Sequence, residues 1–286
     1  MNNPKLLIHG GFFSESGTNQ EIKNAKQNAL AEIATQSFEF LKTHTAVQTV
    51  VYAVSLLEDC ELFNAGIGSQ IQSDGIIRLS ASLMDGNSKK FSGVINIEDI
   101  KNPILVAEKL SSYDDSVLSG DGALDFARQN GFDFFNPEIE QRRKEYYAKL
   151  EESRKGTVGC VALDEDGNLA AATSTGGKGF EIPSRVSDSA TVAGNYANDY
   201  AAISCTGVGE DIVSVALAAK IATRVSDGFT LKAAVDKSFA ELKAIDGFAG
   251  IIGLTNTGEI YHCDSHPYMV WASMDGELKV FEGGDD

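Results

Sequence analysis

Residues 156–174, Gly-Thr-Val-Gly-Cys-Val-Ala-Leu-Asp-Glu-Asp-Gly-Asn-Leu-Ala-Ala-Ala-Thr-Ser, predict a buried β-hairpin. Two apolar runs, 158–163 and 169–174, flank the turn signal Asp166-Gly167-Asn168. Both runs are largely apolar, which is typical of strands buried on both faces. Thr157 follows Gly156 at the start of the hairpin. Cleavage between them would give the chain an N-terminal Thr that carries both a hydroxyl nucleophile and a free amine.

Further apolar runs of strand or helix length extend the pattern along the chain. We expect strands at 5–8, 76–83, 92–97, 250–254, 259–263, 268–273 and 278–281, and helices at 19–42, 47–57, 103–110, 212–225 and 231–242. Residues 63–69 predict a tight glycine loop. The charged stretch 133–156 predicts a linker, helical in part. The whole, residues 1–286, is expected to be one α+β domain of two packed, largely antiparallel sheets with helices outside.

The composition restricts the classes of partner. The 286 residues carry a formal net charge of −17, so phosphate backbones and anionic membranes would repel the chain. Small molecules or peptides are the expected ligands. The four cysteines lie far apart, without the pairing of a zinc knuckle or disulfide framework. The start lacks a cationic segment followed by an apolar one, so we expect a cytoplasmic protein.

A glycine-rich turn follows the hairpin at Thr173-Ser174-Thr175-Gly176-Gly177-Lys178-Gly179. A phosphate-binding P-loop requires Ser or Thr after Gly-Lys and a leading glycine, and these positions hold Gly179 and Ala172. We therefore expect either a polar turn that faces the substrate or a purely structural turn. In both cases the hairpin would bring Thr175 near Thr157.

Three other polar groups allow a functional and a structural interpretation. Arg185 and Asp188 can hold the carboxylate and amine of a zwitterion, or form an ordinary surface ion pair. The loop 206–210, Thr-Gly-Val-Gly-Glu, can form an oxyanion hole or simply cap a helix. The residues His262, Cys263, Asp264 and His266 suggest a metal site, but their adjacent spacing in a strand places successive side chains on opposite faces.

Taken together and in order, the motifs resemble those of the plant-type asparaginase and isoaspartyl peptidase family of N-terminal nucleophile (Ntn) hydrolases. The matching stretches cover nearly the whole chain: Ile8-His9-Gly10-Gly11, residues 57–69, Ser82-Leu83-Met84-Asp85-Gly86, Gly156-Thr157-Val158-Gly159, Thr173-Ser174-Thr175-Gly176-Gly177, Arg185-Val186-Ser187-Asp188-Ser189 and residues 204–210. The resemblance implies a four-layer αββα sandwich. It also implies autocatalytic cleavage into an α subunit, 1–156, and a β subunit, 157–286, with two such units forming an (αβ)₂ homo-oligomer.

The same resemblance implies a role for each site residue and no organic cofactor. Thr157 would be the nucleophile, Thr175 and Asn64 would support it, Thr206 and Gly207 would stabilise the oxyanion, Arg185 would bind the substrate α-carboxylate, and Asp188 and Gly209 would bind its α-amine. The substrates implied are asparagine and β-aspartyl dipeptides. Backbone carbonyls of Leu57, Glu58, Cys60, Phe63, Ala65 and Ile67 would hold a structural sodium ion, a hard cation that prefers oxygen ligands.

Several positions depart from the family pattern. Phe12-Phe13 replaces a small pair, Arg78 and Ser80 lie where acidic residues are common, and Asp115 lies where His is common. These departures bear on substrate preference and maturation rate. Two alternatives stay open: an amidase of the aspartylglucosaminidase type, and an unprocessed protein that binds acidic amino acids without turnover.

Overall fold

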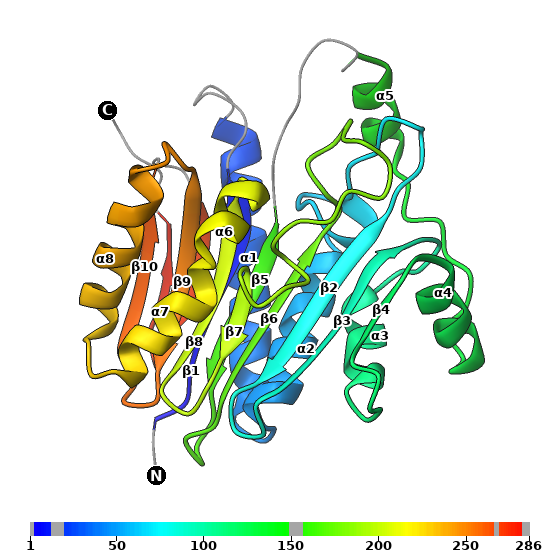
Figure 1. Cartoon of the computed structure of the whole chain (residues 1–286). Coiled ribbons are helices and arrows are strands. Elements are labelled where there is room, and N and C mark those ends of the chain that lie inside the picture. The colour runs from blue at the N-terminus through cyan, green and yellow to red at the C-terminus, as the bar shows by residue number, and fades with distance from the viewer. Residues whose placement is uncertain (1–2, 13–19, 149–156, 266–268, 282–286) are drawn as a thin grey trace.

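The structure is a computed structural model that describes residues 3–12, 20–148, 157–265 and 269–281. It is a mixed α/β fold with two β-sheets and flanking helices (Figure 1). An eight-stranded sheet has the order β12-β11-β1-β5-β6-β2-β3-β4, and a four-stranded sheet has the order β10-β9-β8-β7. Among the residues that the structure describes, the paired strands are antiparallel except β3 with β4.

The strands of the larger sheet are β1 (Lys5–Phe12), β2 (Leu79–Asp85), β3 (Lys90–Ile97), β4 (Val117–Ser119), β5 (Val158–Leu163), β6 (Leu169–Thr175), β11 (Met269–Met274) and β12 (Leu278–Val280). Those of the smaller sheet are β7 (Asn195–Ala197), β8 (Ala201–Gly207), β9 (Ala249–Thr255) and β10 (Ile260–Asp264). The helices are α1 (Gln20–Leu41), α2 (Ala46–Glu58), α3 (Pro103–Leu110), α4 (Gly120–Gln129), α5 (Glu140–Ala148), α6 (Gly209–Val215), α7 (Leu217–Ser226) and α8 (Leu231–Lys243).

The hairpin predicted from residues 156–174 forms the centre of the larger sheet. Strand β5 pairs with β6 in a continuous register from Val158 opposite Ser174 to Leu163 opposite Leu169. The turn closes through a hydrogen bond from Asp164 N to Asn168 O of 3.1 Å. Every residue of both strands is buried, because β1 and β2 pair on either side and apolar layers cover both faces.

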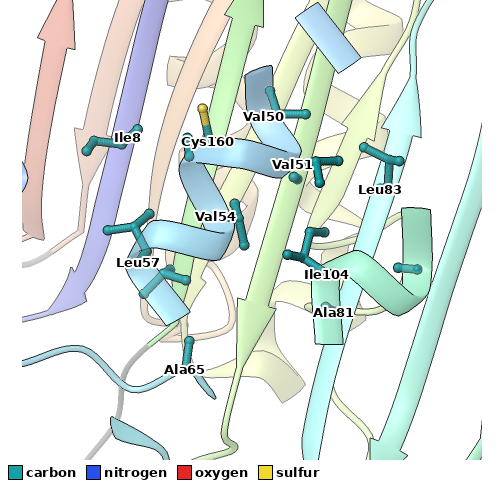
Figure 2. Packing of buried hydrophobic residues seen from close by; sticks show 14 of the residues in the cluster. Ile8, Val50, Val51, Val54, Leu57, Ala65, Ala81, Leu83, Ile104 and Cys160 are labelled. Atoms are coloured by element: carbon teal, nitrogen blue, oxygen red, sulfur yellow. The ribbon is translucent and has the colours of Figure 1, made fainter. Parts of the chain in front are cut away.

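One apolar cluster lies between the larger sheet and its helices. In Figure 2, α2 lies over the strands that carry Ile8, Cys160 and Leu83. Its buried residues in this cluster are Val50, Val51, Val54 and Leu57. Thr45 caps the start of α2 with a reciprocal capping box through Gln48, which fixes where this helix begins. The buried apolar residues of α2 place this side of the helix on β5 and β6.

The other face of the larger sheet packs on the smaller sheet. Val161 and Leu163 of β5 share a cluster with Ile252 and Leu254 of β9. Ile251, the neighbour of Ile252, belongs instead to a third cluster with residues of α6, α7 and α8. This alternation is the period of two expected for a strand that is covered on both faces.

Most expected elements are confirmed, but two differ in extent and others were missed. Strand β1 continues through Gly10 to Phe12 instead of ending at Ile8, because it keeps pairing with β11 across an irregularity after His9, where Gly11 has φ 84°. The helix expected over 212–225 is interrupted at Ala216, whose left-handed φ of 50° separates α6 from α7. The strands β4, β7 and β8 and the helix α4 were not predicted.

The charged stretch 133–156 contains α5, and residues 149–156 lie outside the described part of the chain. Within the described ranges, no helix combines the length and the apolarity that a membrane crossing requires.

A pair of matched substitutions tests the packing between the sheets. Ile252 is fully buried, whereas Ile245 is 50% exposed. We expect Ile252→Ala to lower the free energy of unfolding by about 2–5 kcal/mol, through lost burial and the cavity it leaves. Ile245→Ala should change it by about 0.5 kcal/mol or less. Urea denaturation of both variants measures this, and equal losses would contradict the assigned packing.

Candidate active site

Thr157 lies immediately before β5 and is 6% exposed. Its Oγ1 donates a hydrogen bond of 3.3 Å to Oγ1 of Thr175, the last residue of β6. The proximity follows from the hairpin register, which pairs Val158 with Ser174 and so brings the two threonines to the same end of adjacent strands. Gly156, the other half of the expected cleavage site, lies outside the described residues.

The turn after β6 is held by Asn64 from the loop that follows α2. Asn64 Nδ2 donates to Gly177 O at 2.5 Å, and Gly176 N donates to Asn64 O at 3.1 Å. Gly177 N in turn donates to Thr175 Oγ1 at 3.1 Å. Gly177 has φ 80°, a conformation that favours glycine. The structure thus brings Asn64, Thr175 and Thr157 into one connected region.

Thr206 provides a buried hydroxyl with no hydrogen-bond partner, on β8 of the smaller sheet. Such groups are rare in native structures and call for an explanation. The next residue, Gly207, has φ 138°, and a Cβ there would lie 2.6 Å from Phe248 O. Helix α6 begins at Gly209 with Val208 at its N-cap and no side-chain capping bond, so Thr206 is not a capping residue. Its free hydroxyl is suited to donate to a bound oxyanion.

Arg185 binds a carboxylate through two nitrogen atoms. Its Nε and Nη2 donate to the two carboxylate oxygens of Glu210 at 2.6 and 2.7 Å. The hydrogen bonds from Arg185 lower the pKa of Glu210 to about 2, so this carboxylate is ionised. The ion pair considered from the sequence was Arg185 with Asp188, whereas the ion pair formed by Arg185 is with Glu210. The Arg185 guanidinium can therefore donate two parallel hydrogen bonds to one carboxylate, which is the geometry suited to a substrate carboxylate.

Asp188 is a buried carboxylate, 3% exposed, whose Oδ2 has no hydrogen-bond partner. Burial raises its pKa to about 6, against the opposing effects of its backbone hydrogen bond and of Ser187 and Arg185. Gly194 and Gly209 lie directly against it, since a Cβ at either position would lie 2.5 Å or 2.6 Å from a carboxylate oxygen. A free acceptor oxygen in a confined space is suited to bind an ammonium group.

A polar chain near Thr157 was not predicted from the sequence. His9 Nε2 lies 3.0 Å from Ser204 Oγ, which lies 2.8 Å from Thr173 Oγ1, and all three residues are fully buried. Burial lowers the pKa of His9 to about 3, so the ring is neutral, and the backbone of Thr157 lies beside it. The sequence signal was a histidine within an apolar strand. Its partners became identifiable only once β1, β6 and β8 were placed together.

In the loop expected to hold sodium, two glycines lie directly against backbone carbonyl oxygens of the same segment. A Cβ on Gly66 would lie 2.3 Å from Glu58 O, and one on Gly68 would lie 1.9 Å from Phe63 O. The carbonyls of Cys60 and Ala65 accept one backbone hydrogen bond each, at 3.2 and 3.1 Å, which leaves each a second lone pair. A compact set of neutral oxygen donors fits a hard cation.

The remaining candidate positions make other contacts. His262 stacks on Trp271 with ring centroids 4.0 Å apart, and His266 lies outside the described residues. In the ranges that the structure describes, no three His, Cys, Asp or Glu side chains gather as a metal site requires. Asp115 is exposed between α3 and β4, and Phe12 packs on Phe248 at 4.4 Å between centroids, while Phe13 is not among the described residues.

Comparison with known proteins gives consistent matches over nearly the whole chain. The profile of a family described as Asparaginase matches residues 2–280. An isoaspartyl peptidase/L-asparaginase from Synechocystis is 43% identical over 96% of this chain and 88% of its own length. An isoaspartyl peptidase from Escherichia coli is 37% identical over 89% and 88%, and a plant-type L-asparaginase from Pyrobaculum calidifontis is 35% identical over 88% and 91%.

Because the Thr206 hydroxyl has no partner, its removal should lower turnover without lowering the free energy of unfolding. Thr206→Val should reduce the turnover of a β-aspartyl dipeptide by about 10²–10³-fold, because one oxyanion donor is lost. It should leave the free energy of unfolding unchanged or raise it by about 1 kcal/mol, because a buried hydroxyl without a partner disappears.

Thr49→Val is the matched control. Thr49 is also fully buried, but its hydroxyl donates to Thr45 O at 2.9 Å within α2. This variant should lose stability and keep its turnover. Denaturation curves and steady-state kinetics measure both effects, and a Thr206→Val protein with full turnover would contradict the assignment.

The raised pKa of Asp188 predicts a pH-dependent stability. Between about pH 4 and 6 the folded chain keeps a proton on Asp188 that the unfolded chain has lost, so this group destabilises the fold as pH rises. Replacing it by Asn should therefore raise the free energy of unfolding, relative to the unaltered Asp188, by about 2 kcal/mol more at pH 7.5 than at pH 4.5.

The measurement is urea denaturation at both pH values, with Thr157→Ala in both proteins so that each stays a single chain. A difference that does not change with pH would show that Asp188 titrates normally.

Proposed function

The chain belongs to the asparaginase family, and on that premise we propose that it is an N-terminal nucleophile hydrolase of asparagine and β-aspartyl dipeptides. The observation that carries the proposal is the buried Thr157 hydroxyl beside Thr175, to which the unpartnered Thr206 hydroxyl and the unpartnered Asp188 carboxylate add further support. Together they provide a nucleophile, an oxyanion donor and an acceptor for a substrate amine. We take the proposed substrates from the names of its relatives, isoaspartyl peptidase/L-asparaginase and isoaspartyl peptidase.

The fold assigned to this function is the four-layer αββα sandwich of a single domain. Its support is the succession of three apolar clusters, from the α1–α3 side through the space between the sheets to the α6–α8 side. This layering leaves β5 in the middle of the protein with Thr157 at its start. The chain is proposed to be cleaved there into residues 1–156 and 157–286.

Maturation and catalysis use the same hydroxyl. Before cleavage, Thr157 Oγ1 attacks the carbonyl of Gly156, the peptide bond is exchanged for an ester, and water hydrolyses that ester. The α-amine released on Thr157 is a base near neutral pH, so it can take the proton from its own Oγ1. Thr175 orients Oγ1 through their 3.3 Å contact, and Asn64 supports Thr175 through the turn at Gly177.

In each turnover, Oγ1 attacks the β-carbonyl of the substrate. The negative charge that develops on its oxygen is stabilised by the Thr206 hydroxyl and the Gly207 N–H. The protonated α-amine of Thr157 then donates its proton to the departing amine, which leaves as ammonia or as an amino acid. Water hydrolyses the aspartyl ester on Thr157 and releases aspartate, which restores the hydroxyl.

Substrate selection depends on the two charged groups of the aspartyl part. Arg185 binds the α-carboxylate, since its pairing with Glu210 uses Nε and Nη2 and leaves the donors on Nη1. Asp188 and Gly209 bind the α-amine, and Asp188 must be ionised to do so. Asparagine and β-aspartyl dipeptides share a free α-carboxylate and α-amine beside a β-amide, so one pocket serves both.

Three further features belong to the proposal. A sodium ion held by the carbonyls of residues 57–67 would make rigid the loop that carries Asn64, and no organic cofactor is required. Two αβ units would associate as (αβ)₂, by resemblance to the family. A cytoplasmic location agrees with four cysteines that are all free thiols.

Release of aspartate from three substrates tests the proposal. We expect the processed protein to hydrolyse L-asparagine and a β-aspartyl dipeptide, and Thr157→Ala to hydrolyse neither. N-acetyl-asparagine, whose amine cannot pair with Asp188, should be a poor substrate.

The alternatives give different results. A preference for glycosylasparagine would favour the aspartylglucosaminidase-type amidase. Binding of aspartate by calorimetry without hydrolysis of any substrate would favour the binding protein and overturn the proposal.

A further inference from the structure

The residue before Arg185 adopts an unusual backbone conformation. Ser184 has φ 67°, in the left-handed region that residues with a side chain rarely occupy. Such conformations persist where surrounding contacts enforce them, and they concentrate at ligand sites. Because Ser184 determines where the chain turns into Arg185, whatever holds Ser184 also fixes the backbone position from which the Arg185 side chain extends to Glu210.

Two buried side chains hold both backbone polar groups of Ser184. Ser184 N donates to Gln72 Oε1 at 3.0 Å, and Asn96 Nδ2 donates to Ser184 O at 2.8 Å. Gln72 is 1% exposed and Asn96 is 8% exposed. We call Gln72 and Asn96 the Ser184 clamp. They come from the segment before β2 and from β3, so the clamp ties the Arg185 loop to the larger sheet.

Each member of the clamp is itself held by a further side chain. Gln72 Oε1 also accepts from Arg78 Nη1 at 2.7 Å. Asn96 N donates to Ser80 Oγ at 3.0 Å. Arg78 and Ser80, which have no role in the proposed chemistry, thus become supports of the clamp.

The clamp adds no free positive charge that would compete for a carboxylate. Arg78 forms ion pairs with Asp74 at 2.9 Å and with Glu98 at 2.8 Å, so two carboxylates compensate its charge. The clamp and its supports line one hollow together with Thr175 and Arg185. Arg185 pairs with one carboxylate, Glu210, through Nε and Nη2, so its Nη1 donors stay available to a substrate.

We propose that Gln72 and Asn96 are positioning residues, which hold Ser184 in the left-handed conformation and thereby aim Arg185 at the α-carboxylate of the substrate. The inference rests on the proposed function. It predicts that the clamp acts on the binding of ligands with a free α-carboxylate and not on the self-cleavage of the chain, because Gly156 presents no carboxylate to Arg185.

Asn96→Gly is the test variant, because Asn96 has φ 53° and glycine keeps that conformation without strain. We expect KM for a β-aspartyl dipeptide and Kd for L-aspartate to rise about tenfold, with kcat within about threefold of wild type, as for loss of one buried hydrogen bond that orients a charged group. In an Arg185→Lys background the same change should alter Kd by less than about twofold, because coupled residues are not additive.

Gln27→Ala is the matched control, since Gln27 Nε2 donates to a backbone carbonyl, Phe281 O, at the same 2.8 Å but between α1 and the end of the chain. It should keep wild-type KM and kcat. Ser80→Ala removes only the support of Asn96 N and should raise KM by about two- to threefold. This second variant keeps the test valid if Asn96→Gly fails to fold.

The outcomes separate the two claims. Wild-type hydrolysis with unchanged KM and Kd in both Asn96→Gly and Ser80→Ala would overturn the clamp and leave the proposed function in place. A tenfold loss that is undiminished in the Arg185→Lys background would also overturn it. A wild-type protein that neither hydrolyses the dipeptide nor binds L-aspartate would overturn the proposed function, and the clamp with it.

Discussion

The pairing of β5 with β6 is the constraint on which the site depends. Its register places Thr157 and Thr175 at the same end of two adjacent central strands, with their hydroxyl oxygens 3.3 Å apart. The turn from Asp164 to Asn168 fixes that register, because turn geometry and loop length determine which residues of a hairpin face each other. The helix α2 on one side and the smaller sheet on the other bury the paired strands and keep them in place.

Two polar groups of the site weaken the fold that carries them. Thr206 keeps a buried hydroxyl without a partner, and Asp188 keeps a buried carboxylate whose pKa is raised to about 6. The fold would be more stable if either group were paired or replaced by an apolar group. Under the proposed function, the substrate would provide the missing partners, an oxyanion for Thr206 and an ammonium group for Asp188. Functional sites typically contain groups that lower the stability of the fold but contribute to activity.

Local sequence signals were sufficient to predict an element whose structure depends on its own residues. The Asp-Gly-Asn turn between two apolar runs identified the central hairpin, and Thr175 was placed near Thr157 for that reason. Ala216 shows the opposite case, since its left-handed conformation breaks a continuous apolar period that predicts one helix. The partner of Arg185 was missed because Glu210 lies 25 positions away, in the first turn of α6. The contacts of Ser184 and His9 likewise join segments that only the folded sheets bring together.

The central claim is that Thr157 becomes an N-terminal nucleophile by cleaving the bond that precedes it. Intact mass spectrometry of the purified protein after incubation tests this most directly, with Thr157→Ala prepared in parallel. The account predicts two fragments from the unaltered protein, one ending at Gly156 and one beginning at Thr157, and a single chain from the variant. A single chain from both proteins, or cleavage that does not depend on Thr157, would contradict it.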